Sequence, residues 1–254
     1  MNMHPFAREA LLIGREGLER LKNARAAVFG LGGVGGIAAE ALARSGVGAI
    51  DLIDSDRYTL TNLNRQLGAL HSTLGQYKAD VMAERLRDIN PDLRVTPRIL
   101  FYLPENAEEI DLSAYDMILD CIDTVTAKLT LIERAYRAGA PIISAMGAGN
   151  RTDPTMLRIG DIYQTSGDPL ARVMRKELRK RGVPALTAVY SLEPARRPVL
   201  PPEAPADPAA PRRDTPGSMA FVPPAMGLAM ASAAVRYLLK DIMTRDTTEE
   251  PLYE

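Results

Sequence analysis

One short segment concentrates glycine, and an acidic residue follows it at a fixed interval. Gly30-Leu31-Gly32-Gly33-Val34-Gly35 forms a G-x-G-x-x-G pattern between an apolar run, AAVFG, and a helix-forming run, IAAEALARSG. In a strand–turn–helix unit, the first glycine permits the tight turn, the second lets a phosphate approach the backbone, and the third allows close helix packing. Asp54 ends a second apolar run, AIDLID, where its carboxylate could accept hydrogen bonds from ribose hydroxyls. The spacing predicts an adenine-nucleotide site, with a glycine-rich packing turn as the alternative.

The residues that follow Asp54 bear on the choice between the dinucleotide NAD and ATP. They include Asp56, Asn62, Arg65 and Lys78, in the runs SDR, NLNRQ and GQYK. The pyrophosphate of a dinucleotide is met mainly by the glycine loop, whereas a triphosphate cleaved at its α-phosphorus needs positive charges on its β- and γ-phosphates. Arg65 and Lys78 can supply those charges, although each alone could be a solvated surface cation. The set as a whole favours ATP.

Two carboxylates mark the end of a later apolar run, MILDCID. Asp123 closes the run, and Asp120 stands three residues before it. A carboxylate at the carboxyl end of a strand could hold Mg²⁺ between phosphates, and the spacing does not choose between the two. Either could instead cap the helix that follows, a role that Asp123 suits well.

Strands and helices must alternate to bring these residues together. The sequence predicts strands at 26–30, 49–54, 94–101, 117–123 and 141–146, and helices at 37–46, 78–90 and 127–138. This alternation predicts an α/β fold, a Rossmann-like, doubly wound and mostly parallel sheet with helices on both faces. Ligands of such sheets bind beyond the carboxyl ends of the strands, which is where the glycine loop, Asp54 and Asp123 would lie.

After residue 150 the pattern predicts a C-terminal strand and helix extension. We expect strands at 156–162 and 186–192, a helix at 170–182 and a closing helix at 225–240. The loop at 194–224 holds ten prolines in 31 residues, which excludes regular structure from most of it. The chain is thus expected to divide into an N-terminal helical segment (1–22), an ATP-binding domain that includes the basic helix (23–193), a proline-rich loop (194–224), the closing helix (225–240) and a tail (241–254).

The predicted helix at 170–182 is strongly basic. Its six cations oppose one acid, Glu177; they are Arg172, Arg175, Lys176, Arg179, Lys180 and Arg181. We expect Val173, Met174 and Leu178 to be buried, which would leave a cationic face for nucleic-acid phosphates; an ordinary solvated helix is the alternative. Four loop arginines could extend this face: Arg196, Arg197, Arg212 and Arg213. Tyr163 and Tyr190 are candidates for base stacking by residue type alone.

Composition excludes several classes of protein. The one cysteine, Cys121, can close no intrachain disulfide and cannot supply the paired thiolates of a structural zinc site, and a reducing, cytoplasmic compartment fits best. The net charge of −1 gives no indication of nucleic-acid binding by the chain as a whole but can hide a local basic patch. The apolar stretch 221–239 contains two prolines and Arg236, so we expect a buried helix rather than a membrane span, and no targeting segment is recognisable.

The motifs GLGGVG, LIDSD, NLNRQ, GQYK and CID, in this order, resemble those of the ubiquitin-activating, E1-like (ThiF/MoeB/HesA) superfamily. Within it, the chain is most similar to the tRNA threonylcarbamoyladenosine dehydratase subfamily. The similarity extends from residues 8–21 through YSLEP (190–194) to 217–235. It implies an E1-like adenylation fold and an enzyme that uses ATP and Mg²⁺ to adenylate a carboxylate. In this subfamily the carboxylate would be that of N6-threonylcarbamoyladenosine, beside the tRNA anticodon, which would cyclise with net loss of water.

The resemblance also implies roles for single residues. The four motif glycines would hold the phosphates and Asp54, assisted by Asp56, the ribose side of the site. Asn62, Arg65 and Lys78 would contact the phosphates, and Asp123 would be the magnesium carboxylate. Arg8 would reach the triphosphate of a neighbouring subunit, in the manner of an arginine finger, so the active unit would be a homodimer. On the sequence alone, Arg8 is a cation on an amphipathic helix.

Other functions stay open at this point. Carrier-activating E1-like enzymes mostly add paired zinc cysteines, and many add a nucleophilic cysteine; this chain has neither set, and Cys121 fits a small apolar residue. The main alternative is an adenylyltransferase for the Gly-Gly tail of a ubiquitin-like sulfur carrier. A nicotinamide dehydrogenase and a non-catalytic nucleotide-binding module are less consistent with the cations. The expected partners are tRNA, a second copy of the chain and a sulfur-relay protein, with no membrane.

Overall fold

A single seven-stranded sheet organises the molecule, described here from a computed structural model that covers residues 4–199 and 216–243. Its strands are β1 (Arg25–Phe29), β2 (Ala49–Ile53), β3 (Arg94–Arg98), β4 (Met117–Asp120), β5 (Ile142–Ala145), β6 (Leu157–Asp161) and β7 (Thr187–Ser191). They lie in the order β3-β2-β1-β4-β5-β7-β6, and every neighbouring pair is parallel except β6 with β7. The predicted doubly wound, mostly parallel sheet is confirmed.

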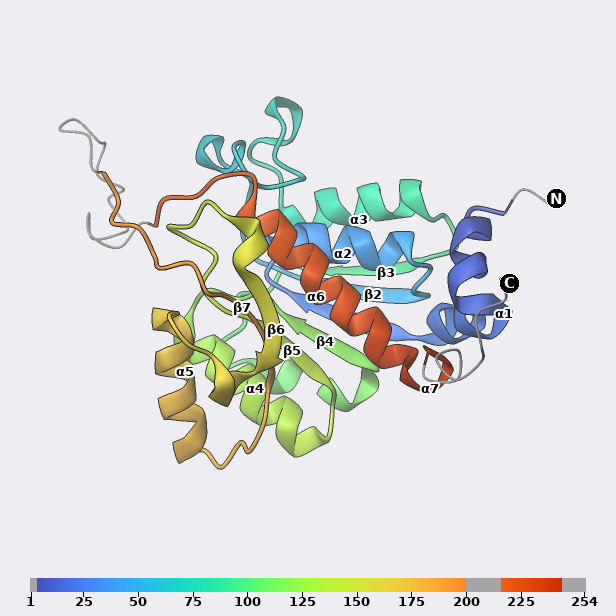
Figure 1. Ribbon diagram of the computed structural model, residues 1–254. Helices are drawn as coiled ribbons and strands as arrows, with labels where there is room; N and C mark the ends of the chain where they lie inside the picture. The colour runs from blue at the N-terminus through green and yellow to red at the C-terminus, as the bar shows by residue number, and fades with distance from the viewer. Residues whose placement is uncertain (1–3, 200–215, 244–254) are drawn as a thin grey trace, which may run out of the picture.

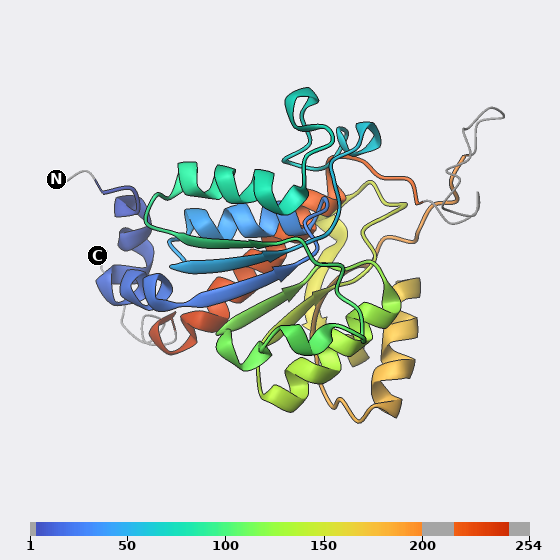
Figure 2. The same ribbon diagram turned by 180° about the vertical axis from the view of Figure 1, so that it is seen from behind.

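Helices cover both faces of this sheet (Figures 1 and 2). They are α1 (Ala7–Asn23), α2 (Gly35–Arg44), α3 (Lys78–Ile89), α4 (Val125–Ala138), α5 (Pro169–Lys180), α6 (Val222–Leu238) and α7 (Lys240–Met243). Alternate residues of the strands face opposite layers, because side chains of a strand alternate in direction. Val28 of β1 thus packs in the core with α2, α3 and α6, whereas Ala27 and Phe29 pack in the core beneath α4.

The strands end earlier than the apolar runs do. The runs predicted strands at 94–101 and 117–123, but β3 ends at Arg98 and β4 at Asp120. The last ladder bond at the end of β4 runs from the Cys121 N–H to the Phe29 carbonyl, after which the chain turns away. Asp123 therefore lies in the loop between β4 and α4, past the strand in which the sequence placed it.

Helix α6 also starts earlier than predicted, at Val222 rather than at 225, and ends at Leu238 rather than at 240. Its first turn contains Pro223 and Pro224, which a helix tolerates there because first-turn N–H groups have no partner inside the helix. A methyl group at Gly227 would lie 2.3 Å from the Val34 carbonyl, so α6 crosses close to the start of α2. In the described part of the chain, no helix is long and apolar enough to cross a membrane.

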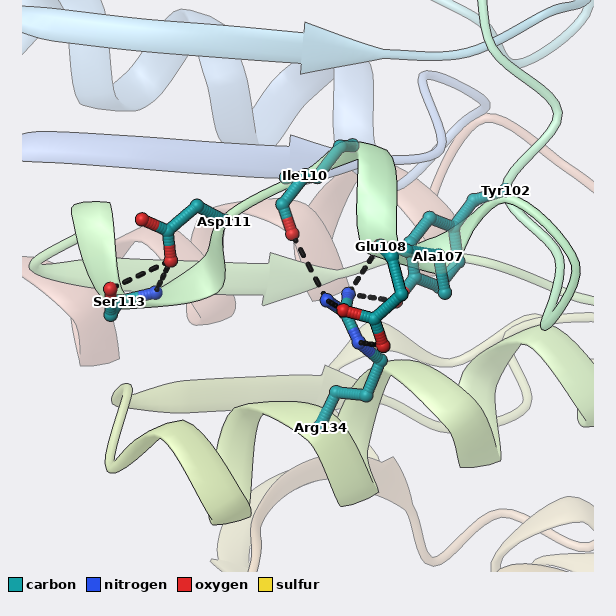
Figure 3. Close-up of polar contacts among 7 residues, drawn as sticks. All are labelled: Tyr102, Ala107, Glu108, Ile110, Asp111, Ser113 and Arg134. Carbon is teal, nitrogen blue, oxygen red and sulfur yellow. Dashed lines mark hydrogen bonds and ion pairs between the residues drawn. The ribbon is translucent and has the colours of Figure 1, made fainter.

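The connection from β3 to β4 (99–116) contains two 3-10 turns, Ala107–Glu109 and Leu112–Ala114, in place of an α-helix. Arg134 of α4 holds it in position (Figure 3): the guanidinium donates to the Ala107 and Ile110 carbonyls and to the Tyr102 hydroxyl, and pairs with Glu108 at 2.9 Å. Arg134 thus holds the connection against α4, on the face of the sheet that α4 covers.

Candidate nucleotide-binding site

A cavity of about 590 Å³ opens at the carboxyl ends of β1, β2, β4 and β5. It spans the junction of β1 and β4, where the chain reverses the order in which it adds strands, and parallel sheets bind ligands at this kind of point. Most of the residues singled out in the sequence line it: Gly30, Gly32, Gly33, Asp54, Asp56, Asn62, Arg65, Lys78 and Asp123. The fold therefore brings together segments that lie far apart in the sequence.

The glycines of the turn meet different surroundings. Gly30 has φ of +86°, and a methyl group there would lie 2.7 Å from the Cys121 carbonyl oxygen. At Gly35 a methyl group would lie 1.7 Å from the Gly30 carbonyl oxygen. At Gly32 the nearest protein atom, Nε2 of Gln66, would be 3.8 Å away. Gly30 and Gly35 are thus required by packing, whereas the space at Gly32 is open to the cavity, as the phosphate-binding role requires.

The start of α2, which follows the glycine turn, can bind an anion. Val34 occupies its N-cap and makes no side-chain hydrogen bond to the first turn. Unpaired N–H groups and the positive end of the helix dipole make such a terminus favourable for phosphate. The start of α2 thus lies where the predicted phosphate loop requires it.

Asp54 ties the turn to the neighbouring strand. Its Oδ2 accepts from the Leu31 N–H at 2.6 Å and its Oδ1 from the Asp56 N–H at 2.7 Å. Burial raises the pKa of this carboxyl group, and the charge of Lys78 and the two N–H donors oppose that effect. The carboxylate is half-buried at the cavity wall, so its remaining lone pairs can accept from a ligand hydroxyl.

The two predicted phosphate cations differ in their environment. Lys78 is the first residue of α3; its side chain is 7% exposed, and Nζ lies 2.7 Å from Oδ2 of Asp56. Arg65 donates to the Thr61 carbonyl at 2.9 Å and to Asn64, and burial lowers the pKa of its guanidinium. Both line the cavity. Asp56 thus balances the lysine charge within the protein, and bound phosphates would compete with it for Lys78.

Asp123 and Asp120, which the sequence left as alternatives, are separated clearly by the structure. Asp120 is fully buried, and its Oδ2 is taken by Lys128 and Ser144, so it cannot serve a metal in the cavity. Asp123 is exposed and lines the cavity, and among residues 4–199 and 216–243 its one side-chain contact is with the Thr124 hydroxyl at 3.5 Å. The helix cap is Thr124, which makes no side-chain cap bond, so Asp123 is not the N-cap.

These surroundings fit Mg²⁺. Magnesium is usually bound through one or two carboxylates together with substrate phosphates and water, and Asp123 offers one exposed carboxylate that lines the cavity. In residues 4–199 and 216–243 no group of three or more His, Cys, Asp or Glu residues could hold a metal on its own. A metal at Asp123 would therefore depend on the phosphates of a nucleotide.

Gln66 is a site residue that the sequence reasoning did not single out. It is 8% exposed and lines the cavity, and its Oε1 is buried without a hydrogen-bond partner in the described structure. Buried polar atoms are normally paired, so an unpaired amide beside Gly32 indicates a ligand position. The sequence could have indicated Gln66 only through its position next to Arg65 in NLNRQ. An uncharged amide does not by itself suggest nucleotide binding.

Cys121 packs as an apolar residue. Its Sγ lies 3.7 Å from Sδ of Met230 in α6, and burial raises the pKa of the thiol. A thiol kept protonated is a poor nucleophile. The apolar packing expected from the sequence is present, but Cys121 is half-buried rather than buried, and it lines the cavity.

Arg8 does not reach the cavity in its own subunit. It is exposed on α1, which precedes β1 and lies at the amino ends of the strands, away from the cavity (Figures 1 and 2). A contact with a nucleotide would have to come from a second copy of the chain.

The basic helix exists as α5, with a different buried stripe from the one predicted. Ala171, Met174 and Leu178 are buried, whereas Val173, predicted as buried, is 43% exposed. Residues three and four positions apart share one face of a helix, so Ala171, Met174 and Leu178 lie together. Val173 falls between these positions and points away from the buried face.

The cations of α5 divide into paired and free groups. Arg175 donates to the carbonyl and hydroxyl of Thr165, Lys180 and Arg181 pair with Glu177, and Arg179 lies 5.0 Å from the centre of the Tyr163 ring. Arg172 and Lys176 are exposed and have no such partner in the described structure. Arg212 and Arg213 lie outside the described residues.

The two tyrosines proposed for base stacking are not free to stack. Tyr163 lies beneath Arg179 and donates its hydroxyl to the Val183 carbonyl at 2.5 Å. Tyr190 is 9% exposed within the core beside α5. Both are therefore structural residues, and residue type alone was an insufficient signal.

The chain is similar in sequence and in structure to known proteins. The chain matches the ThiF family over residues 6–253. It is 46% identical over 248 residues to a Bacillus subtilis protein named tRNA threonylcarbamoyladenosine dehydratase, a match that covers 94% of this chain and 96% of the relative. It is also similar to crystal structures of the Escherichia coli tRNA N6-threonylcarbamoyladenosine dehydratase. The complex with AMP has 35% identity, a TM-score of 0.81 and 96% coverage of both chains. The complex with ATP has 34% identity, a TM-score of 0.79 and coverage of 97% of this chain and 96% of the other.

Proposed function

Because the chain belongs to the ThiF family, we propose that it is an ATP-dependent tRNA threonylcarbamoyladenosine dehydratase. The observation that carries the substrate is the near full-length match, at 46% identity, to a relative of that name. The cavity supports the ATP-dependent step, because the glycine turn, Asp54, Arg65 and Lys78 line it together. A carboxylate-activating enzyme needs this combination of phosphate-binding backbone and cations.

In the first step, the carboxylate of the threonylcarbamoyl group attacks the α-phosphorus of ATP and releases pyrophosphate. The open space at Gly32 and the start of α2 receive the phosphates, and Asp54 accepts from the ribose. Arg65, Lys78 and Asn62 stabilise the charge that develops on the leaving pyrophosphate. Asp56, which pairs with Lys78, holds the lysine ready until phosphates replace it.

Magnesium would be held by Asp123 together with the phosphates, where it would neutralise charge on the triphosphate. Asp123 presents its oxygens to the cavity from the short loop between β4 and α4.

In the second step, the carbamoyl group of the modification attacks the acyl carbon of the adenylate and AMP leaves. One carboxylate oxygen departs with AMP and the carbamoyl group gives up one N–H proton, so the nucleoside, counted from its protonated carboxylic acid, loses one water in total. The protein needs no thioester relay, which agrees with a Cys121 thiol that burial keeps protonated. A nucleophile in the same molecule is already close to its electrophile, and proximity then replaces an enzymic nucleophile.

We propose that tRNA binds along α5, whose cations were selected from the sequence as Arg172, Arg175, Lys176, Arg179 and Lys180. Arg172 and Lys176 project into solvent and carry the contact with phosphates most directly. Arg175 and Lys180 are engaged within the protein, so their contribution is smaller. The start of α5 lines the cavity at Pro169 and Leu170, so a tRNA bound there would lie beside the reacting groups.

We further propose that the active unit is a homodimer in which Arg8 of one subunit serves the cavity of the other. Leu11 and Leu12, on the same helix as Arg8, are 85% and 80% exposed, which favours burial against another protein surface. We also propose a cytoplasmic location, because a chain with a single cysteine fits a reducing compartment. A sulfur-relay protein is an additional partner that we propose only from the resemblance of the sequence.

One assay tests the function. The protein is incubated with ATP, Mg²⁺ and tRNA that carries threonylcarbamoyladenosine, and the nucleosides are analysed by mass spectrometry. We expect that nucleoside to lose one water while AMP forms. An unchanged nucleoside, with pyrophosphate exchange only after a Gly-Gly-tailed carrier protein is added, would overturn the proposal in favour of a carrier-activating enzyme.

A further inference from the structure

A buried charged cluster lies directly behind the loop that carries Asp123. Lys128, Asp120 and Ser144 are each 0% exposed. Nζ of Lys128 lies 2.7 Å from Oδ2 of Asp120 and 3.0 Å from Oγ of Ser144, and the Ser144 hydroxyl donates to the same Oδ2 at 2.6 Å. The cluster joins the end of β4 to β5 and to the first turn of α4.

The second oxygen of Asp120 connects the cluster to the cavity. Oδ1 of Asp120 accepts from the Ile122 N–H at 3.2 Å, within the loop 121–124. The carbonyl of Cys121 packs beneath Gly30, where a methyl group would approach it to 2.7 Å. The Asp120 carboxylate therefore supports two parts of the cavity lining: the backbone that packs beneath the glycine turn and the loop that carries Asp123.

The loop has little freedom of its own. Four residues separate the end of β4 from the start of α4, and Lys128 is fixed at the helix end by its own N–H bond to the Thr124 carbonyl. A charge buried without its partner is unfavourable, so loss of Lys128 would force Asp120 to move or to take up a proton. Either change would alter its bond to Ile122.

We infer that Lys128 is a positioning residue, which through Asp120 sets Asp123 against the metal–phosphate end of a bound nucleotide. This inference rests on the ATP-binding part of the proposed function and does not involve tRNA. Groups that orient a metal ligand typically change metal affinity by about 10–100-fold when they are removed. The effect should therefore appear in the contribution of Mg²⁺ to nucleotide binding.

The test measures ATP affinity by calorimetry with Mg²⁺ and again with EDTA, for folded protein. The dissociation constant in EDTA divided by the dissociation constant with Mg²⁺ reports the contribution of the metal, and a larger ratio means a larger contribution. We expect Lys128→Met to reduce that ratio by at least about tenfold, as the reference variant Asp123→Asn should. Adding Asp120→Asn to Lys128→Met should restore part of the ratio, because the new amide side chain is uncharged and its oxygen can still accept from the Ile122 N–H.

Asp51→Asn is the matched control. Asp51 is 1% exposed and binds Arg25, Arg98 and Tyr115, so it is also a buried ionic cluster of the sheet, but it does not line the cavity. It should lower thermal stability without changing the ratio. A folded Lys128→Met protein with an unchanged ratio would overturn the inference.

A second variant covers the case in which Lys128→Met does not fold. Ser144→Ala leaves the Lys128–Asp120 pair in place and removes one hydrogen bond to Asp120, and we expect the ratio to fall about threefold. No fall in a folded Ser144→Ala protein would overturn the inference. If wild-type protein does not bind ATP at all, the proposed function itself fails, which is a separate result.

Discussion

Two glycines of one turn, Gly32 and Gly35, serve different ends, and substitution by alanine should separate them. Gly35→Ala would place a methyl group 1.7 Å from the Gly30 carbonyl oxygen, so we expect a loss of thermal stability. Gly32→Ala meets no protein atom closer than 3.8 Å, so the fold should persist while the methyl group occupies the space of a phosphate. Thermal unfolding and ATP titration check both. Normal ATP affinity in Gly32→Ala would remove that glycine from the site.

At this scale, the sequence identifies residues whose role depends on local pattern. Asp54 follows a glycine turn at a typical spacing, and Lys78 stands at a helix start, so both could be predicted. The surroundings of Lys128 and Gln66 could not, because they depend on Asp120, Ser144 and the turn at Gly32, which only the folded sheet brings near them. Arg175 shows the converse, since a cation in a basic run is engaged by Thr165.

At the scale of elements, the boundaries follow from hydrogen bonds and caps that apolar runs do not report. The run MILDCID continues for three residues beyond β4 because its later members pack against α6 and the glycine turn instead of extending the ladder. The two prolines at the start of α6 mark a helix start rather than the end of the preceding loop. Element type and order could be predicted, whereas ends depended on contacts between elements.

Glu193, just past β7, joins that strand to the segment after β5. Its carboxylate accepts from the N–H groups of Thr152 and Asp153 at 2.9 Å, and Arg151 donates to its carbonyl. Burial alone would raise the pKa of Glu193, but the hydrogen bonds from Asp153, Thr152 and Arg196 to its carboxylate outweigh it and the pKa is lowered. A lowered carboxyl pKa stabilises the fold above the unfolded pKa, about 4.3, and that contribution is lost as the pH falls through the folded value.

Glu193→Gln should therefore unfold at a lower temperature than wild type at pH 7. The difference should narrow as the pH is taken below about 4. Thermal unfolding of the two proteins across this pH range provides the measurement. A difference that stays constant from pH 7 down to strong acid would show that the ionised carboxylate is not what stabilises this junction.

The exposed face of α5 is the element expected to meet tRNA. Changing Arg172 and Lys176 together to glutamine should weaken tRNA binding and reduce the slope of log affinity against log salt by about 2, one for each lost phosphate contact. Binding is measured at several salt concentrations. Arg87→Gln with Arg94→Gln, on α3 and on β3 at the opposite edge of the sheet, is the charge-matched control. An unchanged slope in the α5 variant would place tRNA elsewhere.

At the scale of the whole molecule, net charge and the position of α1 acquire meaning only from the fold. The total of −1 averages the segment 170–182, which has six cations and one acid, against a remainder with a net charge of −6, and the sheet places α5 beside the cavity. Helix α1, which contains Arg8, lies at the other end of the sheet (Figure 1), so the expected role of Arg8 requires two molecules rather than one. Neither the position of α5 beside the cavity nor the distance of α1 from it can be predicted from the sequence, because both depend on which strands are neighbours.

The proposed homodimer makes a prediction that one subunit alone cannot satisfy. Lys78→Ala should abolish turnover because it removes a cation from the cavity, and Arg8→Ala should abolish it because the neighbouring cavity lacks its arginine. When the two variants are mixed and allowed to exchange subunits, each mixed dimer has one cavity with Lys78 intact and with Arg8 supplied by the other subunit. With equal mixing, about a quarter of all cavities are complete in a two-fold dimer. Turnover should recover to about that fraction of wild type, whereas a mixture that stays inactive would show that Arg8 does not act across a subunit boundary.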